Sequence, residues 1–300
     1  MRRMPSIPFL FLAASLSAVG QEASSKAAAA HSAEAQKDAP AVDKSLSGGQ
    51  YVNRTTKLSL INAQISWEEL NLPCKDEWRQ TLQSPASTED KIREWSGLKA
   101  KCGISGLYEY RMGVLHVLAG RYDEARTVTQ AALAPGTPYE KYLLSVIANA
   151  DLGQGNLDSS LLRYEALINK YPEYYDGYAG VGAVKLVQHK IEESIQYLNE
   201  GAKRARTLDI YRNLTIAYAQ LGRHEEAVKA MNDAYAIDKS IVKDRESMHA
   251  AAISYILLGK LHVADGFLKM LVQADPQAAN DPEIRKTMGY VSKKLEEEKK

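Results

Sequence analysis

The 300-residue sequence lacks the features of several common protein classes. Its formal net charge is only +1, and no basic block occurs outside the extreme N-terminus. Nucleic acid usually requires a concentrated positive surface, so we expect no nucleic-acid partner. The apolar run from Ile7 to Val19 is too short and too interrupted to span a bilayer comfortably. These absences favour a folded protein without stable membrane insertion.

Motifs for catalysis and cofactor binding are also missing. The six histidines form no His-x-x-x-His pattern, and neither a Gly-x-Ser-x-Gly motif nor a dinucleotide fingerprint is present. Acidic pairs such as Glu192-Glu193 and Glu225-Glu226 recur at matching places, which indicates solvated helix starts rather than acid–base catalysis. We therefore predict no enzyme activity, no cofactor and no metal site.

The first twenty residues have the pattern of a secretion signal. Arg2 and Arg3 precede the apolar run, and small residues favour cleavage after Gly20. An uncleaved membrane anchor is the alternative. Residues 21–50 are rich in Ala and Ser and contain almost no large apolar side chain, which predicts a disordered linker. We expect a periplasmic or secreted protein.

The sequence contains only two cysteines, Cys74 and Cys102. Export would place them in an oxidising compartment, where a disulfide between them would close a loop of about 28 residues. A redox-active pair is not expected because the sequence has no Cys-x-x-Cys motif. Residues 51–105 are predicted to form an N-terminal helical cap that contains this disulfide.

One sequence pattern recurs from about residue 106 onward: a turn residue, a bulky residue, acidic residues and then a small residue. Its copies are separated by 35, 34, 33 and 37 residues, and they begin at Gly120, Gly155, His189, Gly222 and Gly259. A period near 34 residues indicates a supersecondary unit of two helices that is repeated along the chain.

The repeat resembles the tetratricopeptide repeat (TPR) family. The small residue early in the first helix is in turn Gly113, Ala148, Gly182, Thr215 and Ala252. The first small residue of the second helix is Ala125, Ser160, Ser194, Ala227 and Ala264, and a second one occurs at Ala132, Gly201 and Ala234. The third unit departs from the pattern, because His189 takes the place of the turn glycine. The resemblance covers residues 106–276 and implies five TPR units stacked as an all-α, right-handed solenoid.

Helices at both ends are predicted to cap this solenoid. Ser87 and Asp90 have the spacing of a capping box, and Trp95 lies on the apolar face of the helix that follows. Asp281 and Pro282 have the pattern of a second helix start. Residues 277–300 are therefore predicted to form a C-terminal capping helix.

The resemblance also implies a binding surface, because the first helix of each TPR unit lines the concave side. The family's contact positions carried over to this sequence are Tyr110, Val114, Val117, Tyr142, Ser145, Asn149, Asp176, Ala183, Asp209, Arg212, Ile216, Glu246, His249 and Ile253. Some of these side chains would instead be core between helices, or be covered by the chain's own segment 58–65. A carboxylate clamp is not expected, because Ser145 and Gly153 stand where the family has lysines.

The leading hypothesis is a non-catalytic interaction scaffold or assembly factor of the cell envelope, which binds a peptide or helix in the concave TPR groove. One alternative is a structural TPR protein that self-associates as a homo-oligomer. Another is an unrecognised binding or enzymatic site in the N-terminal segment.

Overall fold

The structure is a computed structural model of the whole chain, and it describes residues 39–41, 76–77, 80, 84, 86–102 and 106–299. The predicted signal and most of the linker lie outside these residues, as do the segment 58–65 and Cys74. The predicted disulfide therefore stays a prediction. Among the described helices, none combines the length and the apolar character that a membrane span requires.

The described chain is helical, as predicted. Helix α4 (Thr88–Cys102) precedes five helix pairs, and α15 (Pro282–Glu297) follows them. The pairs are α5 (Leu107–Leu118) with α6 (Tyr122–Gln130), α7 (Glu140–Gly153) with α8 (Leu157–Lys170), α9 (Tyr175–Val187) with α10 (Ile191–Arg204), α11 (Leu208–Gln220) with α12 (His224–Ile237), and α13 (Arg245–Leu257) with α14 (Leu261–Ala274). Two short 3-10 helices, η1 (Lys239–Lys243) and η2 (Pro276–Asn280), lie between elements near the C-terminus.

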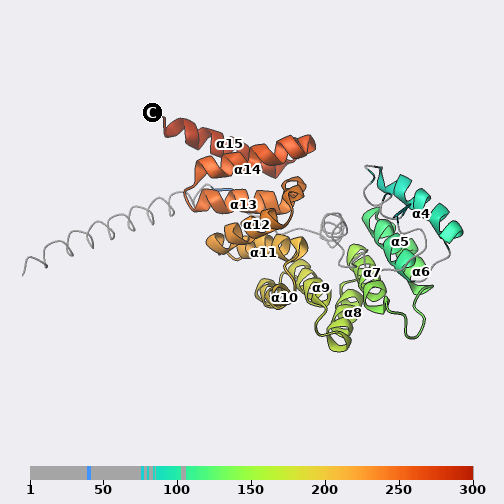
Figure 1. Cartoon of the computed structure of the whole chain (residues 1–300). Helices are drawn as coiled ribbons and strands as arrows, with labels where there is room; N and C mark the ends of the chain where they lie inside the picture. Colours follow the sequence, from blue (N-terminus) through green and yellow to red (C-terminus); the bar gives the residue numbers. More distant parts are fainter. Residues whose placement is uncertain are drawn as a thin grey trace, which may run out of the picture.

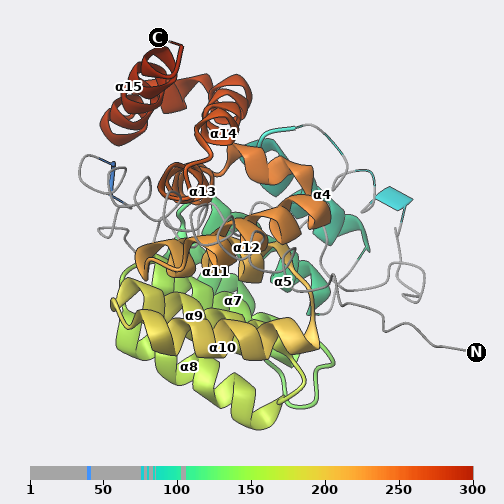
Figure 2. The same cartoon turned by 90° about the vertical axis from the view of Figure 1, so that its left-hand side faces the viewer.

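The helix pairs stack in sequence order. A first helix such as α9 contacts its own partner α10, the preceding second helix α8, and the first helices α7 and α11 on either side. Figure 1 shows the pairs following one another along an arc from α4 to α15, with α7 on its inner side and α8 on its outer side. Figure 2 shows the same succession from α8 towards α15. The all-α solenoid predicted from the sequence is confirmed.

The turn within each pair has the same backbone structure in all five pairs. In the first pair, the Gly120 amide donates to the Val117 carbonyl at 3.0 Å, and the Arg121 amide donates to the His116 carbonyl at 2.8 Å. This Schellman pattern satisfies two carbonyls at the helix end and needs a residue with positive φ. The φ angles are 73° at Gly120, 82° at Gly155, 78° at Gly222 and 71° at Gly259. Glycine adopts this conformation without steric cost, which explains its recurrence at the turn.

His189 occupies the same position in the third pair. Its φ is 58°, and it is the one non-glycine residue with positive φ in the described part of the chain. The His189 amide donates to the Leu186 carbonyl at 3.1 Å, and the Lys190 amide donates to the Lys185 carbonyl at 2.9 Å. The turn therefore forms despite the Cβ atom, which makes this conformation unfavourable by about 1 kcal/mol.

Close approach between helices depends on small side chains. A Cβ atom added at Gly113 would lie 2.4 Å from Thr129 Cγ2, and one added at Gly182 would lie 2.6 Å from Leu198 Cγ. On the facing helix, the Ser194 hydroxyl donates to the Gly182 carbonyl at 2.7 Å and is fully buried. Small residues at these places let the two helices of a pair interlock.

One small residue was predicted in the wrong element. Ala132 lies beyond the end of α6, in the turn that leads to α7, whereas Gly201 and Ala234 lie within α10 and α12. Pro135 and Gly136 follow it closely, and Gly136 has a φ of 81°. Neither residue favours a continued helix, so α6 ends early.

Side-chain hydrogen bonds define the starts of α4 and α15. The Asp90 amide donates to Ser87 Oγ at 3.2 Å, and Trp95 is only 1% exposed on the side of α4 that packs on α5. At the other end, Asp281 Oδ1 accepts hydrogen bonds from the amides of Glu283 at 3.0 Å and Ile284 at 3.3 Å. Side-chain acceptors thus satisfy free amides at the starts of α4 and α15.

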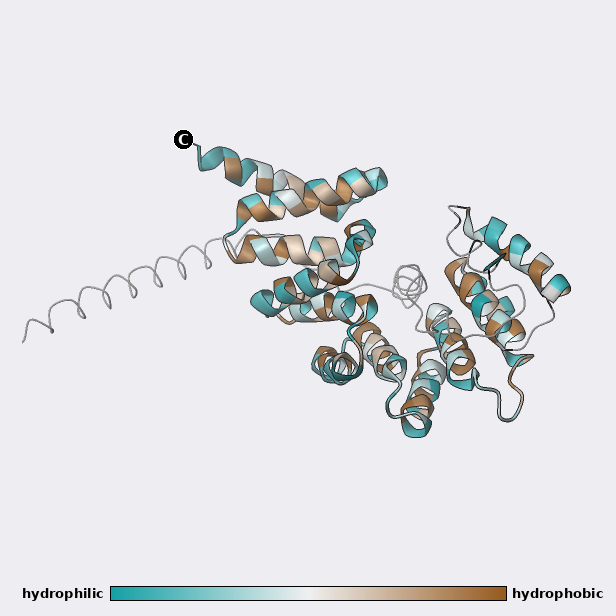
Figure 3. Cartoon of the chain, viewed as in Figure 1, coloured by the Kyte–Doolittle hydropathy of each residue, from teal (hydrophilic) through white to brown (hydrophobic). Residues whose placement is uncertain are grey.

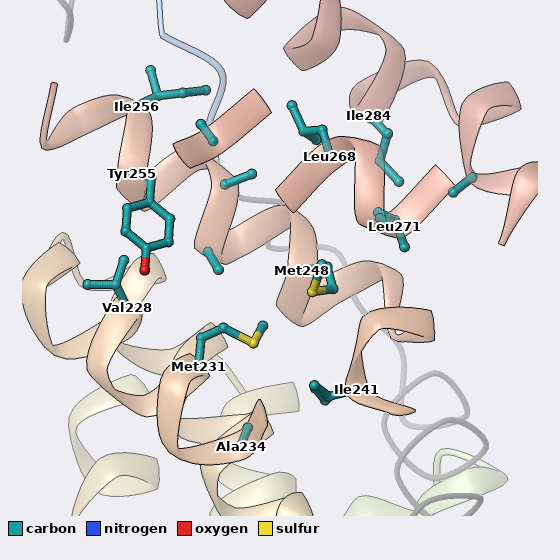
Figure 4. Packing of buried hydrophobic residues seen from close by; sticks show 14 of the residues in the cluster. Val228, Met231, Ala234, Ile241, Met248, Tyr255, Ile256, Leu268, Leu271 and Ile284 are labelled. Carbon is teal, nitrogen blue, oxygen red and sulfur yellow. The ribbon is translucent and has the colours of Figure 1, made fainter. Parts of the chain in front are cut away.

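Hydrophobic and hydrophilic residues alternate along the helices (Figure 3), and the buried apolar residues form clusters between them. At the C-terminal end, Met231, Met248, Leu268 and Ile284 belong to one buried cluster with Ile241 (Figure 4). Ile241 is completely buried and comes from η1, which contacts both α12 and α14. The insertion of η1 between the fourth and fifth pairs accounts for the longest repeat spacing.

We expect His189→Gly to raise the free energy of unfolding by about 0.5–1 kcal/mol, because it removes the Cβ penalty at a positive φ. A shift of the urea midpoint to higher concentration at an unchanged slope would measure this gain. Gln188→Gly is the control, since Gln188 has a φ of −77° and should give no gain. Equal effects of the two changes would contradict the prediction.

We expect Gly182→Val to lower the free energy of unfolding by about 2 kcal/mol, because the new side chain overlaps Leu198. Gly266→Val introduces the same residue in α14, where an added Cβ meets nothing within 4 Å, and should be neutral or stabilising. Urea unfolding of both variants measures the difference. A tolerated valine at residue 182 would refute the close-approach argument.

Candidate functional site

The candidate site is the surface formed by the first helices α5, α7, α9, α11 and α13, which carry all fourteen predicted contact residues. The buried members are Tyr110, Val114, Val117, Ser145, Ala183, Arg212, Ile216, His249 and Ile253. The half-buried members are Tyr142, Asn149, Asp176, Asp209 and Glu246. None of them is exposed, so a partner would reach the half-buried set most directly.

The aliphatic members of the predicted site contribute to the core. Val114 and Val117 are 5% and 1% exposed and belong to the same buried cluster as Leu143 and Val146. Ile216 is 1% exposed and belongs to the cluster around α10 and α11. These side chains therefore stabilise the stacking of the helix pairs.

Arg212 is fully buried and links two repeats. Its Nε donates to Asp244 Oδ2 at 2.8 Å, its Nη1 donates to Asn213 Oδ1 at 2.9 Å, and its Nη2 lies 3.5 Å from Glu246 Oε2. Asp244 in turn is the N-cap of α13, where its Oδ1 accepts from the Ser247 amide at 3.0 Å. Arg212 thus joins α11 to the start of the next first helix.

The electrostatics of this pair favour the charged carboxylate. Burial alone would raise the pKa of Asp244, but the positive charge of Arg212 and the hydrogen bonds from Ser247 hold that pKa below its ordinary value. A charge pair buried this deeply is sensitive to the loss of either partner. His249 has a comparable structural contact, since its Nε2 lies 2.8 Å from Thr287 Oγ1 of α15.

A row of tyrosine rings crosses the first three repeats. The Tyr110 and Tyr142 centroids are 5.4 Å apart at 48°, and the Tyr142 and Tyr174 centroids are 5.6 Å apart at 82°. The Lys141 ammonium lies 5.0 Å from the Tyr142 centroid and 5.2 Å from the Tyr174 centroid, within range of a cation–π interaction. The rings therefore present faces that attract positive charge.

Asp176 lies beside this row. Its carboxylate accepts hydrogen bonds from the Ser145 hydroxyl and, at 3.3 Å, from the Tyr174 hydroxyl. Burial raises the pKa of Asp176, and the two hydrogen bonds only partly offset that effect. Burial also raises the pKa of Tyr110 to about 12, with Asp176 and Asp209 contributing through their negative charge.

The structure adds two residues that sequence reasoning missed. Tyr174 immediately precedes α9 and Lys141 is the second residue of α7, and neither falls on the contact positions carried over from the family. The only sequence signal was the excess of tyrosine, with 17 Tyr against 3 Phe. Among the described residues, no group of three or more His, Cys, Asp and Glu side chains could hold a metal ion.

Comparisons with known proteins bear on the fold. No protein-family model and no curated protein matches the sequence. The structure of the APC/C hetero-tetramer Cut9-Hcn1 aligns with a TM-score of 0.59 at 13% identity, over 81% of this chain and 47% of that chain. A TPR protein of Thermus thermophilus has a TM-score of 0.49 at 21% identity, over 62% and 98% of the two chains. A crystal structure of MamA has a TM-score of 0.42 at 15% identity, and the alignment covers 59% of this chain and 95% of that chain.

The chain is therefore an all-α solenoid built from stacked helix pairs. Three observations identify the type of solenoid. All five pairs share one turn, small residues stand at the predicted places, and the structure resembles a solved structure. Its fold is that of the tetratricopeptide-repeat proteins.

We expect Arg212→Met to lower the free energy of unfolding at pH 7 by about 3 kcal/mol, because it leaves the Asp244 carboxylate buried without its cation. The penalty should shrink as the pH falls towards 3.8, the ordinary pKa of an aspartate, since a protonated carboxyl needs no cation. Urea unfolding at several pH values measures both effects.

Two variants control this prediction. Adding Asp244→Asn to Arg212→Met should recover part of the loss, because the unpaired charge is gone. Arg206→Met breaks the exposed ion pair with Asp233, where Arg206 is 61% exposed, and should change stability by less than about 1 kcal/mol. A pH-independent loss in Arg212→Met would contradict the charge argument.

Proposed function

We propose that this protein is a non-catalytic scaffold that holds another protein or peptide against the inner surface of its repeats. The observation that carries the proposal is a row of half-buried side chains along that surface. Tyr142, Asp176, Asp209 and Glu246 lie at equivalent places near the starts of α7, α9, α11 and α13, one in each of the last four repeats. A periodic row of this kind fits an elongated partner that runs across several repeats.

The fold supports an interaction role. Stacked repeats produce an extended surface that does not depend on one catalytic pocket. Cut9-Hcn1, which shares this fold, is described as a hetero-tetramer and is therefore itself part of a complex. The proposal that the scaffold works in the cell envelope rests on the signal-like residues 1–20. Self-association through the same surface is the alternative.

Site-specific photo-crosslinking tests the proposal. A photoreactive phenylalanine derivative at Asn149, which is half-buried on α7, should crosslink to one dominant protein in cells. The same group at Leu162, which is 69% exposed on α8, is the matched control and should give no such product. Mass spectrometry of the adducts identifies the captured protein, and binding of that purified protein to this chain confirms it.

Each outcome of this experiment decides between the candidates. Capture of one foreign protein from Asn149 but not from Leu162 supports the scaffold. Capture of a second copy of this chain from Asn149 favours self-association. Equal products from both positions, or none from either, would contradict binding on the inner surface.

A further inference from the structure

Asp176 and its neighbours form a small site on the inner surface, which we call the tyrosine–aspartate site and define as Tyr110, Tyr142, Ser145, Tyr174 and Asp176. These residues come from α5, α7 and the start of α9, so three consecutive repeats build it. The ring centroids are 5.4 Å and 5.6 Å apart, and the carboxylate accepts from the Ser145 and Tyr174 hydroxyls.

The Asp176 carboxylate has hydrogen-bond donors, but it forms no ion pair with the described part of the chain. The ion pairs that the described residues form in the neighbouring helices involve other carboxylates, namely Asp151, Asp244 and Glu246. Lys141 lies against the Tyr142 and Tyr174 rings, yet it makes no ion pair with Asp176. Partial burial of an ionised carboxylate without a cation is unfavourable, and burial raises the pKa of Asp176 accordingly.

Two of the other half-buried contact residues are also acidic. Asp209 and Glu246 occupy the equivalent places in the next two repeats and are half-buried like Asp176. The fully buried Arg212 is paired with Asp244, and its Nη2 also lies 3.5 Å from Glu246 Oε2, so Glu246 already has a cation beside it. Three of the five half-buried contact residues are therefore carboxylates, which complement a positively charged partner.

The chemistry of the site discriminates between kinds of cation. Calcium prefers six to eight oxygen ligands, and one carboxylate with two hydroxyls and flanking rings does not provide them. An ammonium or guanidinium group combines contact with ring faces and a hydrogen bond to a carboxylate. We propose that the tyrosine–aspartate site receives a lysine or arginine side chain of a separate protein partner.

This inference rests on the proposed scaffold function and names the chemistry of its partner. The test uses the full chain and two labelled peptides of about 18 residues, in which leucine alternates with lysine at helical spacing, or with glutamine at the same places. Fluorescence anisotropy at about 150 mM salt should show about tenfold tighter binding of the lysine peptide. Asp176→Asn should remove most of that preference and leave binding of the glutamine peptide unchanged.

The matched control is Asp158→Asn, which makes the same chemical change at an exposed residue in the first turn of α8. It should bind both peptides as the parent protein does. Asp176→Asn should also unfold at a higher urea concentration than the parent protein at pH 7, because it removes a carboxylate charge that burial disfavours. Weaker binding together with higher stability separates recognition from a merely structural role.

Three results would overturn the inference. The first is equal affinity of the parent protein for both peptides, and the second is unchanged binding of the lysine peptide by Asp176→Asn. The third is Asp176-dependent binding of a synthetic peptide of residues 51–70 of this chain, with no binding of the lysine peptide, which would assign the surface to the chain itself. If crosslinking from Asn149 still captures the same partner in the Asp176→Asn variant, the scaffold function stands and only the charge recognition fails.

Discussion

The whole structure depends on one backbone constraint: a residue with positive φ follows each first helix. That residue reverses the chain through two hydrogen bonds to the helix end, as at Gly120, and directs the second helix back along the first. The two helices interlock only where a side chain is small, as at Gly182. Each pair still has an apolar face, which the next pair covers. Pairs that share the same turn therefore stack one on another and form the solenoid.

The same repetition generates the candidate site. Equivalent positions of successive first helices come to lie along one surface, which turns four separate residues into a row from Tyr142 to Glu246. Two kinds of charged group share this surface. Arg212 is neutralised by Asp244 and stabilises the stack, whereas Asp176 has hydrogen-bond donors without a cation. The first arrangement joins two repeats, and the second is the basis of the proposed recognition of a positively charged partner.

Much of the fold could be predicted because its determinants are local. These determinants are a glycine at a turn, a serine before a helix and an aspartate before a proline, and each acts within a few residues. The repeat period and the helix caps could therefore be predicted from the sequence. His189 shows that the pattern tolerates an exception, since its neighbours still form the Schellman bonds. Ala132 was wrongly assigned to the second helix of the first unit. Pro135 and Gly136 make α6 end earlier than the 34-residue period predicts.

The sequence by itself determined the repeating two-helix unit, its turns and its capping residues, because each of these depends on short-range backbone conformation and side-chain size. Only the tertiary structure decided which predicted contact residues are accessible. Arg212 meets Asp244 across 32 residues of sequence, and Ser145 meets Asp176 across 31, in both cases between neighbouring repeats. Contacts of this kind depend on how neighbouring repeats stack, and the burial and charge of the inner surface follow from that stacking.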